Sequence, residues 1–116
     1  MFEGLITFFG TRDLEENEKF YVEALGLKLY KDQGVCKIYK VKENAYIGFC
    51  SHLEVTVAKR GPIITILSDD VDAVYKNLID KGLKPLDKPK KNHRFNIYHF
   101  FTADPDGYLI EIQKFL

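Results

Sequence analysis

The chain has 116 residues, of which 46% are hydrophobic and 14% aromatic, enough to bury the core of one compact domain. Its 17 basic residues balance 17 acidic ones, which excludes a strong overall attraction to nucleic acid or to an anionic membrane. No apolar run approaches the ~20 residues of a membrane span. The opening MFEGLITFFG also lacks the basic and small-residue features of a signal peptide. We therefore expect a cytoplasmic protein that recognises its partners through local features.

The first half of the chain predicts a β-α-β-β-β order. Residues 5–9 form an apolar run typical of a strand, and Asp13 followed by Glu16 is typical of a helix N-terminus. Gly26 is placed to end this helix, because glycine adopts a left-handed conformation easily. The residues expected on the inner side of the helix are Leu14, Phe20, Tyr21 and Leu25. The three strands expected after it span 27–30, 35–41 and 45–50.

The two cysteines, Cys36 and Cys50, match neither a metal-binding spacing nor a dense secreted framework. We predict two reduced, half-buried thiols. A hairpin that pairs Lys40 with Tyr46 would nevertheless place the two cysteines opposite each other, so a reversible disulfide is the alternative.

The second half repeats the element order of the first. Residues 62–68 predict a strand, Asp69 and Asp70 predict a helix N-terminus, and Gly82 ends that helix. The apolar stripe of the helix consists of Val71, Val74, Tyr75, Leu78 and Ile79. After it we expect strands at 83–86, 94–102 and 108–115, a basic loop at 88–93 and a tight turn at 104–107.

This repetition indicates internal duplication within a single domain. Module 1 is expected at about 1–52, the connection at about 53–60 and module 2 at about 61–116. We predict an α+β fold in which two tandem β-α-β-β-β modules form curved mixed sheets around a concave cleft, each with a helix on its other face.

Glu111 interrupts the apolar rhythm of the last strand. Alternation places Glu111 with Leu109 and Gln113 on one face, while Tyr108, Ile110 and Ile112 form the face toward the helix. An unpaired carboxylate removed from water is unfavourable, so Glu111 requires a hydrogen-bond donor or an open, wet cleft. The candidate donors are Arg94, Tyr39 and His99.

The three histidines have different settings. His52 follows a strand and reads as a solvated loop residue. His93 lies in a basic loop, which is either a solvated charge run or an anion-binding lip of the cleft. His99 lies within an aromatic strand, where it is either a core residue or the acid-base partner of Glu111.

The predicted cleft lining is apolar and aromatic with a few polar points, as in a small-molecule pocket or a protein interface. Alternation places Ile6, Phe8, Gly10, Tyr46, Gly48, Cys50, Ile63, Thr65 and Leu67 on it. The candidate ligand-binding residues are Phe8, Tyr39, Tyr46, Cys50, Arg94, His99, Leu109 and Glu111. The candidate catalytic residues are Glu111 and His99.

Three motifs together resemble the vicinal oxygen chelate superfamily, which includes glyoxalase I, bleomycin- and fosfomycin-resistance proteins and extradiol dioxygenases. They are the DL…FY…LGL pattern of residues 13–27, DDVDAVY at 69–75 and DPDGYLIEIQ at 104–113. The resemblance covers nearly the whole chain. It implies a cleft that binds small molecules and a homodimer.

Enzymes of this superfamily hold one divalent metal on the concave face. Carried over to this chain, the last-strand ligand corresponds to Glu111, and the other three positions correspond to Ile6, Gly48 and Ile63, which offer no donor side chain. A Lewis-acid metal needs several oxygen or nitrogen donors. We therefore expect no metal and no cofactor, although a divalent metal held by Glu111 and a histidine is the alternative.

The resulting prediction is a small-molecule-binding protein that takes an apolar or aromatic compound without metal. One alternative is an enzyme, either a metal-dependent lyase, isomerase or dioxygenase that uses Glu111 with a histidine, or a metal-free one that uses His99 and Glu111 as acid and base. The other is a non-catalytic interaction domain. We expect no nucleic-acid or membrane partner, and the ligand is not identified by the sequence.

Overall fold

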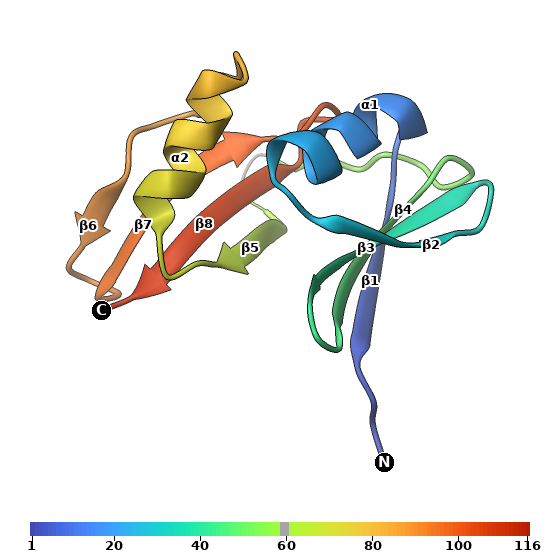
Figure 1. Cartoon of the computed structure of the whole chain (residues 1–116), viewed down its shortest axis with the longest axis horizontal. Coiled ribbons are helices and arrows are strands. Elements are labelled where there is room, and N and C mark those ends of the chain that lie inside the picture. The colour runs from blue at the N-terminus through green and yellow to red at the C-terminus, as the bar shows by residue number, and fades with distance from the viewer. Residues whose placement is uncertain (59–60) are drawn as a thin grey trace. The chain divides into compact units, whose positions relative to one another are not determined.

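The computed structural model describes residues 1–58 and 61–116. Contacts divide the chain into two compact units, unit 1 (Met1–Thr56) and unit 2 (Val57–Leu116). Each unit contains a four-stranded mixed sheet and a helical segment in the order β-α-β-β-β (Figure 1). The predicted α+β fold with two tandem modules is confirmed. No helix within the described residues is long and apolar enough to cross a membrane.

The sheet of unit 1 has the strand order β1-β4-β3-β2. Its strands are β1 (Leu5–Gly10), β2 (Lys28–Asp32), β3 (Cys36–Lys42) and β4 (Ala45–Cys50). Strand β1 runs parallel to β4, and the other neighbours are antiparallel. In the β3–β4 hairpin Lys40 pairs with Tyr46 and Cys36 pairs with Cys50, which is the predicted register.

The helical segment of unit 1 begins where the sequence predicts. The carboxylate of Asp13 accepts hydrogen bonds from the backbone N–H groups of Glu15 and Glu16, which caps α1 (Leu14–Glu18). The segment then continues as the π-helical η1 (Lys19–Ala24), a widening that the apolar spacing does not predict. Gly26 follows with φ +81°, in the left-handed region that suits glycine.

The sheet of unit 2 has the matching order β5-β8-β7-β6. Its strands are β5 (Ile63–Leu67), β6 (Lys90–Asn92), β7 (Ile97–Ala103) and β8 (Leu109–Phe115). Helix α2 (Val71–Asp80) is capped by Asp70, whose carboxylate accepts the backbone N–H of Ala73. The turn before β8 is held by Asp104, whose side chain accepts the backbone N–H groups of Asp106 and Tyr108.

Two predicted strand positions in unit 2 are wrong. Residues 83–86 do not form a strand, and the short strand β6 lies instead inside the segment predicted as a basic loop. Pro85 has no N–H to donate to a ladder, which disfavours pairing there. Strand β7 begins only at Ile97, because the side chain of Asn92 accepts the N–H groups of Arg94 and Phe95 and turns the chain.

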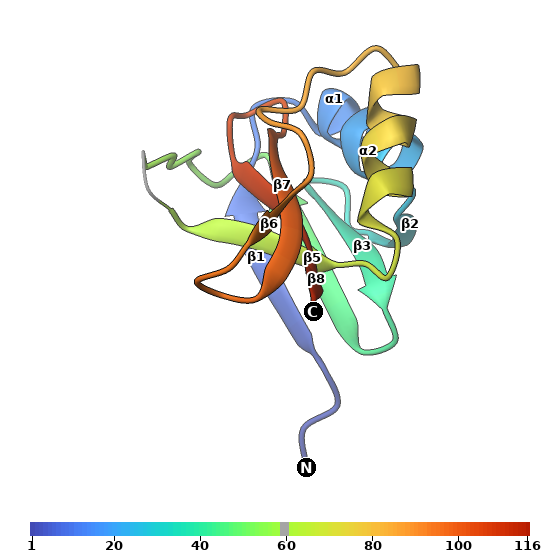
Figure 2. The ribbon, with the colours of Figure 1, turned by 90° about the vertical axis from the view of Figure 1, so that its left-hand side faces the viewer.

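As predicted, one face of the unit 2 sheet packs against the helix and the other face carries Glu111. Helix α2 lies along one face (Figure 2), where Tyr75 packs edge-on against Phe100 and the Tyr98 hydroxyl donates to Asp72. Ile110 and Ile112 pair across the ladder with Thr102 and Phe100 and are almost completely buried on that face. Alternation therefore turns Glu111 toward the opposite face.

Candidate functional site

The candidate site is built around a buried pair on the face of unit 2 opposite α2. The Nδ1 atom of His99 lies 2.6 Å from the Oε2 atom of Glu111. Both residues are buried, with exposed fractions of 5% and 7%. Strands β7 and β8 position them, since the antiparallel register sets Glu111 opposite Phe101 and leaves His99 one diagonal step away. Of the donors considered from the sequence, His99 is the one that contacts Glu111.

The second oxygen of Glu111 is also engaged. The hydroxyl of Thr65, directly opposite on β5, donates to Oε1 at 2.8 Å. Burial, the strongest influence, raises the pKa of the Glu111 carboxyl, but hydrogen bonds with Thr65, His99 and Gln113 together bring the pKa below its ordinary value. Glu111 is therefore an ionised carboxylate at neutral pH.

This charge state determines the tautomer of the histidine. An ionised carboxylate only accepts hydrogen bonds, so Nδ1 of His99 carries the proton that lies between them. The other ring nitrogen, Nε2, is buried and has no hydrogen-bond partner among the described residues. In a neutral imidazole this Nε2 is an acceptor. A buried acceptor without a donor is unfavourable by about 1–3 kcal/mol, so a bound donor group would be stabilised there.

A pocket of about 490 Å³ opens beside the pair. Its wall is mainly aromatic and aliphatic, with a few polar side chains on β6, β7 and β8. The lining residues are Ile63, Asn92, Phe95, Ile97, His99, Phe101, Glu111, Gln113 and Phe115. All of them belong to unit 2, so this unit alone forms the pocket.

The other two predicted site residues of unit 2 lie outside this lining. Arg94 sits in the turn before β7, where its guanidinium carbon is 5.2 Å from the centre of the Phe95 ring. Phe95 itself lines the pocket, whereas Arg94 does not. Leu109 is half-buried at the start of β8 and pairs with Ile63 and Ala103.

Tyr39, predicted both as a ligand-binding residue and as a donor to Glu111, has a different role. Its ring is fully buried between Tyr21 and Phe49 in the core of unit 1, and its hydroxyl donates to Oδ1 of Asn17 at 2.9 Å. The physical reason is strand alternation. Tyr39 pairs with Ile47 and faces the helical segment, whereas Lys40 and Ile38 face the other side.

The remaining predicted ligand-binding residues lie on one face of the unit 1 sheet. The register aligns Phe8 with Gly48 and places Tyr46 and Cys50 at alternate positions of the neighbouring strand. The Phe8 ring lies over Gly48 so closely that a Cβ atom there would collide with it. Tyr46 packs on Tyr30, with ring centres 4.5 Å apart. These residues share a face as predicted, but they do not belong to the pocket of unit 2.

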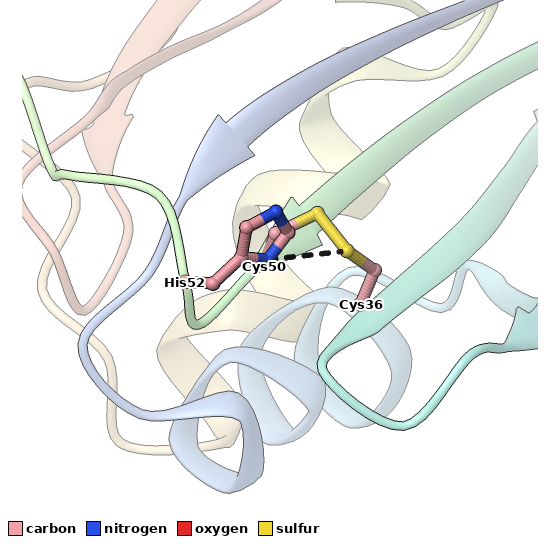
Figure 3. Close-up of side chains that lie close together, drawn as sticks. All are labelled: Cys36, Cys50 and His52. Carbon is pink, nitrogen blue, oxygen red and sulfur yellow. Dashed lines mark hydrogen bonds between the residues drawn. A yellow bond between two sulfur atoms is a disulfide. The ribbon is translucent and has the colours of Figure 1, made fainter.

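The prediction of two reduced, half-buried thiols is wrong for this structure. Cys36 and Cys50 form a disulfide, and both are buried. The physical reason is the hairpin register, which holds the two side chains on one face at directly opposite positions. His52 lies beside the bond, with its Nδ1 atom 3.9 Å from the sulfur of Cys36 (Figure 3). His93, the histidine of the predicted basic loop, is an exposed turn residue.

Several lining residues were not predicted as part of a site. Alternation predicts Gln113 on the face of Glu111 but gives it no role. Thr65, which donates to Glu111, is predicted only as part of the cleft lining and not as a partner of the carboxylate. Ile97, His99 and Phe101 alternate along β7, and Glu111, Gln113 and Phe115 alternate along β8. The periodicity of these two strands was the available signal, but it becomes a pocket only when their mutual register is known.

The residues present do not fit the divalent metal that the resemblance implies. Both carboxylate oxygens of Glu111 are already hydrogen-bonded, to Thr65 and to His99. Ile6, Gly48 and Ile63, at the other ligand positions, carry no donor atom on their side chains. Within the described ranges, the one group of three or more histidine, cysteine, aspartate or glutamate side chains with convergent ligand atoms is Cys36, Cys50 and His52. Glu111 belongs to no such group.

Comparison with known proteins identifies the family. The model of the Glyoxalase/Bleomycin resistance protein/Dioxygenase superfamily matches residues 6–112. No curated protein matches the chain.

Solved structures show the same fold. A glyoxalase/bleomycin resistance protein/dioxygenase from Alicyclobacillus acidocaldarius is similar with a TM-score of 0.80 at 19% identity, over 97% of this chain and 91% of that one. TioX from Micromonospora sp. ML1 is similar with a TM-score of 0.81 at 14% identity, over 97% of this chain and 98% of that one. At these identities the likeness concerns the fold alone. The family match over residues 6–112 goes further, and the chain belongs to the Glyoxalase/Bleomycin resistance protein/Dioxygenase superfamily.

Proposed function

We propose that the chain binds a small apolar or aromatic molecule in the pocket of unit 2, and that the molecule carries a hydroxyl or another hydrogen-bond donor. The single observation that carries this proposal is the buried Nε2 atom of His99. It belongs to a residue of the pocket wall and has no partner among the described residues.

The shape and chemistry of the pocket support an aromatic ligand. Phe95, Phe101 and Phe115 supply broad apolar surfaces, and a volume of about 490 Å³ lies in the range of small-molecule sites. Phe95 and Phe115 are 61% and 66% exposed, so burying them against a ligand would remove apolar surface from water. This burial is the expected source of affinity.

The His99–Glu111 pair supports selectivity for a donor. The carboxylate of Glu111 fixes the proton on Nδ1, which leaves Nε2 of a neutral imidazole as an acceptor. A ligand hydroxyl would satisfy this acceptor, whereas an ether or hydrocarbon would leave it unpaired. We expect a preference of about 1 kcal/mol, or about fivefold in the dissociation constant.

A matched pair of probes tests the proposal. Binding of 1-naphthol and of its methyl ether is measured by fluorescence titration with the whole chain. The expected result is tighter binding of the naphthol, and loss of that preference in His99→Gln. The amide of glutamine can still donate to Glu111 but offers no imidazole nitrogen to the pocket.

His93→Gln is the matched control, because it makes the same change at an exposed turn position of the same unit. It should leave both dissociation constants unchanged. Failure of the wild-type chain to bind either probe would contradict an aromatic-binding pocket. Equal binding of the two probes would contradict the role of Nε2.

A second candidate function is proton transfer at the same pair. A carboxylate bound to Nδ1 supports an imidazole that takes a proton at Nε2, as a general base does. The test is solvent-deuterium exchange at the carbon beside the carbonyl of an α-hydroxyketone, followed by NMR. Exchange that is accelerated by the wild-type chain and lost in His99→Gln would favour an enzyme. Exchange at the uncatalysed rate would favour binding alone.

The assembly expected from the sequence, a homodimer, belongs to the same proposal. Strand β1 is an edge strand of its sheet, and its side chains Leu5, Ile6 and Phe8 are 69%, 39% and 44% exposed. An exposed apolar edge strand is a favourable surface for contact with a second copy of the chain. Light scattering over a range of concentrations tests this, and a monomeric mass at all of them would contradict it.

A further inference from the structure

A second group of reactive side chains lies in unit 1, apart from the residues used above. Cys36 is the first residue of the inner strand β3, Cys50 is the last residue of β4, and His52 follows in the adjoining turn (Figure 3). The imidazole turns its Nδ1 atom toward the sulfur of Cys36 at 3.9 Å. One ligand atom from each of the three residues lies within 4.8 Å of the others.

The backbone holds these residues together independently of the S–S bond. The carbonyl of Val35 accepts both the N–H of Ser51, at 2.8 Å, and its hydroxyl, at 3.3 Å. The carbonyl of Cys50 accepts the N–H of Thr11 at 3.1 Å and that of Leu53 at 3.4 Å. These bonds fix the ends of the strands and the turn that carries His52. Reduction of the disulfide would therefore leave two thiols and an imidazole adjacent.

Two cysteine sulfurs and one imidazole form a ligand set that suits zinc and similar thiophilic cations. Around a tetrahedral zinc ion the sulfur–nitrogen separation is about 3.6 Å and the sulfur–sulfur separation about 3.8 Å, given bonds of about 2.3 and 2.0–2.1 Å. The observed 3.9 Å between Cys36 and His52 is close to the first value. In the disulfide, both sulfurs are bonded to each other, and His52 alone can ligate.

The surroundings allow access from one side. Cys36 and Cys50 are 7% and 2% exposed, whereas His52 is exposed in its turn. A cation would be shielded by the strands on the cysteine side and would meet solvent on the histidine side. A water molecule could then complete the fourth position.

We propose that reduced Cys36 and Cys50, with His52, form a site for one zinc-like divalent cation, and that oxidation to the disulfide abolishes it. Reduction by two equivalents of a thiol transfers two electrons and two protons to the S–S bond and leaves the reductant as a disulfide. Binding of the cation displaces the two cysteine thiol protons. Oxidation by a disulfide oxidant removes two electrons, re-forms the S–S bond and releases the cation.

The whole chain, reduced under anaerobic conditions and freed of reductant, tests the proposal. Titration with Zn²⁺ against a chromophoric chelator should show one tight site per chain. Titration with Co²⁺ should give the near-ultraviolet charge-transfer band of cobalt–thiolate bonds. The oxidised chain should show no charge-transfer band and no tight site.

Variants and a control assign the ligands. Cys36→Ser should abolish tight binding. His52→Gln should weaken it at least ~10-fold, because losing even a hydrogen-bond partner of a metal ligand costs about 10–100-fold in affinity. His93→Gln removes an exposed histidine in unit 2 and should change nothing. A measurement on the wild-type chain, protection of both thiols from alkylation by Zn²⁺, does not depend on the folding of any variant.

Three results would overturn the proposal. The first is reduced protein with two titratable thiols and no tight Zn²⁺ site. The second is equal binding by the oxidised and reduced forms, which would indicate a histidine-only surface site. The third is two free thiols after exposure to a disulfide oxidant. None of these results bears on the pocket of unit 2, so the proposal stands or falls separately from the proposed function.

Discussion

His99 and Glu111 are joined diagonally across β7 and β8, with 2.6 Å between Nδ1 and Oε2, although the ladder pairs His99 with Gln113. The other carboxylate oxygen, Oε1, accepts a hydrogen bond from the hydroxyl of Thr65 on the neighbouring strand β5. The ionised carboxylate of Glu111 on β8 is thus hydrogen-bonded to side chains of both β5 and β7. The consequences for stability and binding can be measured.

Glu111→Gln should destabilise the fold at neutral pH by ~1–3 kcal/mol, because hydrogen bonds to a buried charge are replaced by bonds to a neutral amide. The folded pKa of Glu111 is lowered from its ordinary value of 4.5. Its contribution is therefore complete above that value and is lost as the pH falls through the lower folded pKa. Urea unfolding of both proteins from neutral to acidic pH measures the difference.

The difference in unfolding free energy should shrink below pH 4.5. Glu3→Gln, at an exposed position, should show little difference at any pH. A Glu111→Gln effect that is independent of pH would show that the charge of the carboxylate contributes nothing.

Thr65→Val should raise the pKa of Glu111, because it removes a hydroxyl that stabilises the charged form. We expect a loss of ~0.5–1.5 kcal/mol in stability, the usual scale of one hydrogen bond. Carbon-detected NMR titration of the glutamate carboxyls reports the pKa. Thr7→Val, on an exposed position of β1, serves as control, and an unmoved Glu111 titration would contradict the contact.

Tyr39→Phe should destabilise unit 1 without changing ligand binding in unit 2. It removes the hydroxyl that donates to Asn17 in a fully buried position, and it leaves the amide oxygen without that donor. The expected loss is ~1–3 kcal/mol. Tyr98→Phe, which removes a bond to Asp72 on the surface, should lose less. A changed affinity for 1-naphthol in Tyr39→Phe, with stability unchanged, would restore the ligand-binding role.

Reduction of the Cys36–Cys50 bond should lower the thermal midpoint of unfolding. The bond closes a segment of 14 residues, for which the chain-entropy model gives at most ~3 kcal/mol. Calorimetry with and without a phosphine reductant measures the change. The double variant Cys36→Ser, Cys50→Ser should be insensitive to the reductant. A wild-type midpoint that is equally insensitive would contradict a disulfide in the purified protein.

Local chemistry explains which features were predictable from the sequence. Asp13 and Asp70 cap helices through their own first turns, and Gly26 tolerates a positive φ, so a few neighbouring residues suffice to recognise them. The short loop between β3 and β4 also sets its register, which made the opposition of Cys36 and Cys50 predictable. Whether the two sulfurs are bonded depends on side-chain approach, which the residue spacing does not report.

The errors arose where distant strands or side chains decide. Tyr39 was assigned to a ligand, although its parity in β3 turns it toward Asn17. Residues 83–86 do not form the predicted strand, because Pro85 has no N–H to donate to a ladder. The short strand β6 pairs with β7 instead, with Lys90 opposite His99. In both cases the local pattern does not determine which face or which segment takes part in the sheet.

The sequence by itself determined the duplicated order of elements and the side of β8 on which Glu111 stands, since both follow from short-range periodicity and turn chemistry. Only the tertiary structure decided what the carboxylate contacts. Thr65 is 46 residues away and His99 is 12, and their approach depends on the joint register of three strands. Such registers are set by packing across the whole sheet, so the partners of Glu111, its charge and the pocket beside it emerge only on folding.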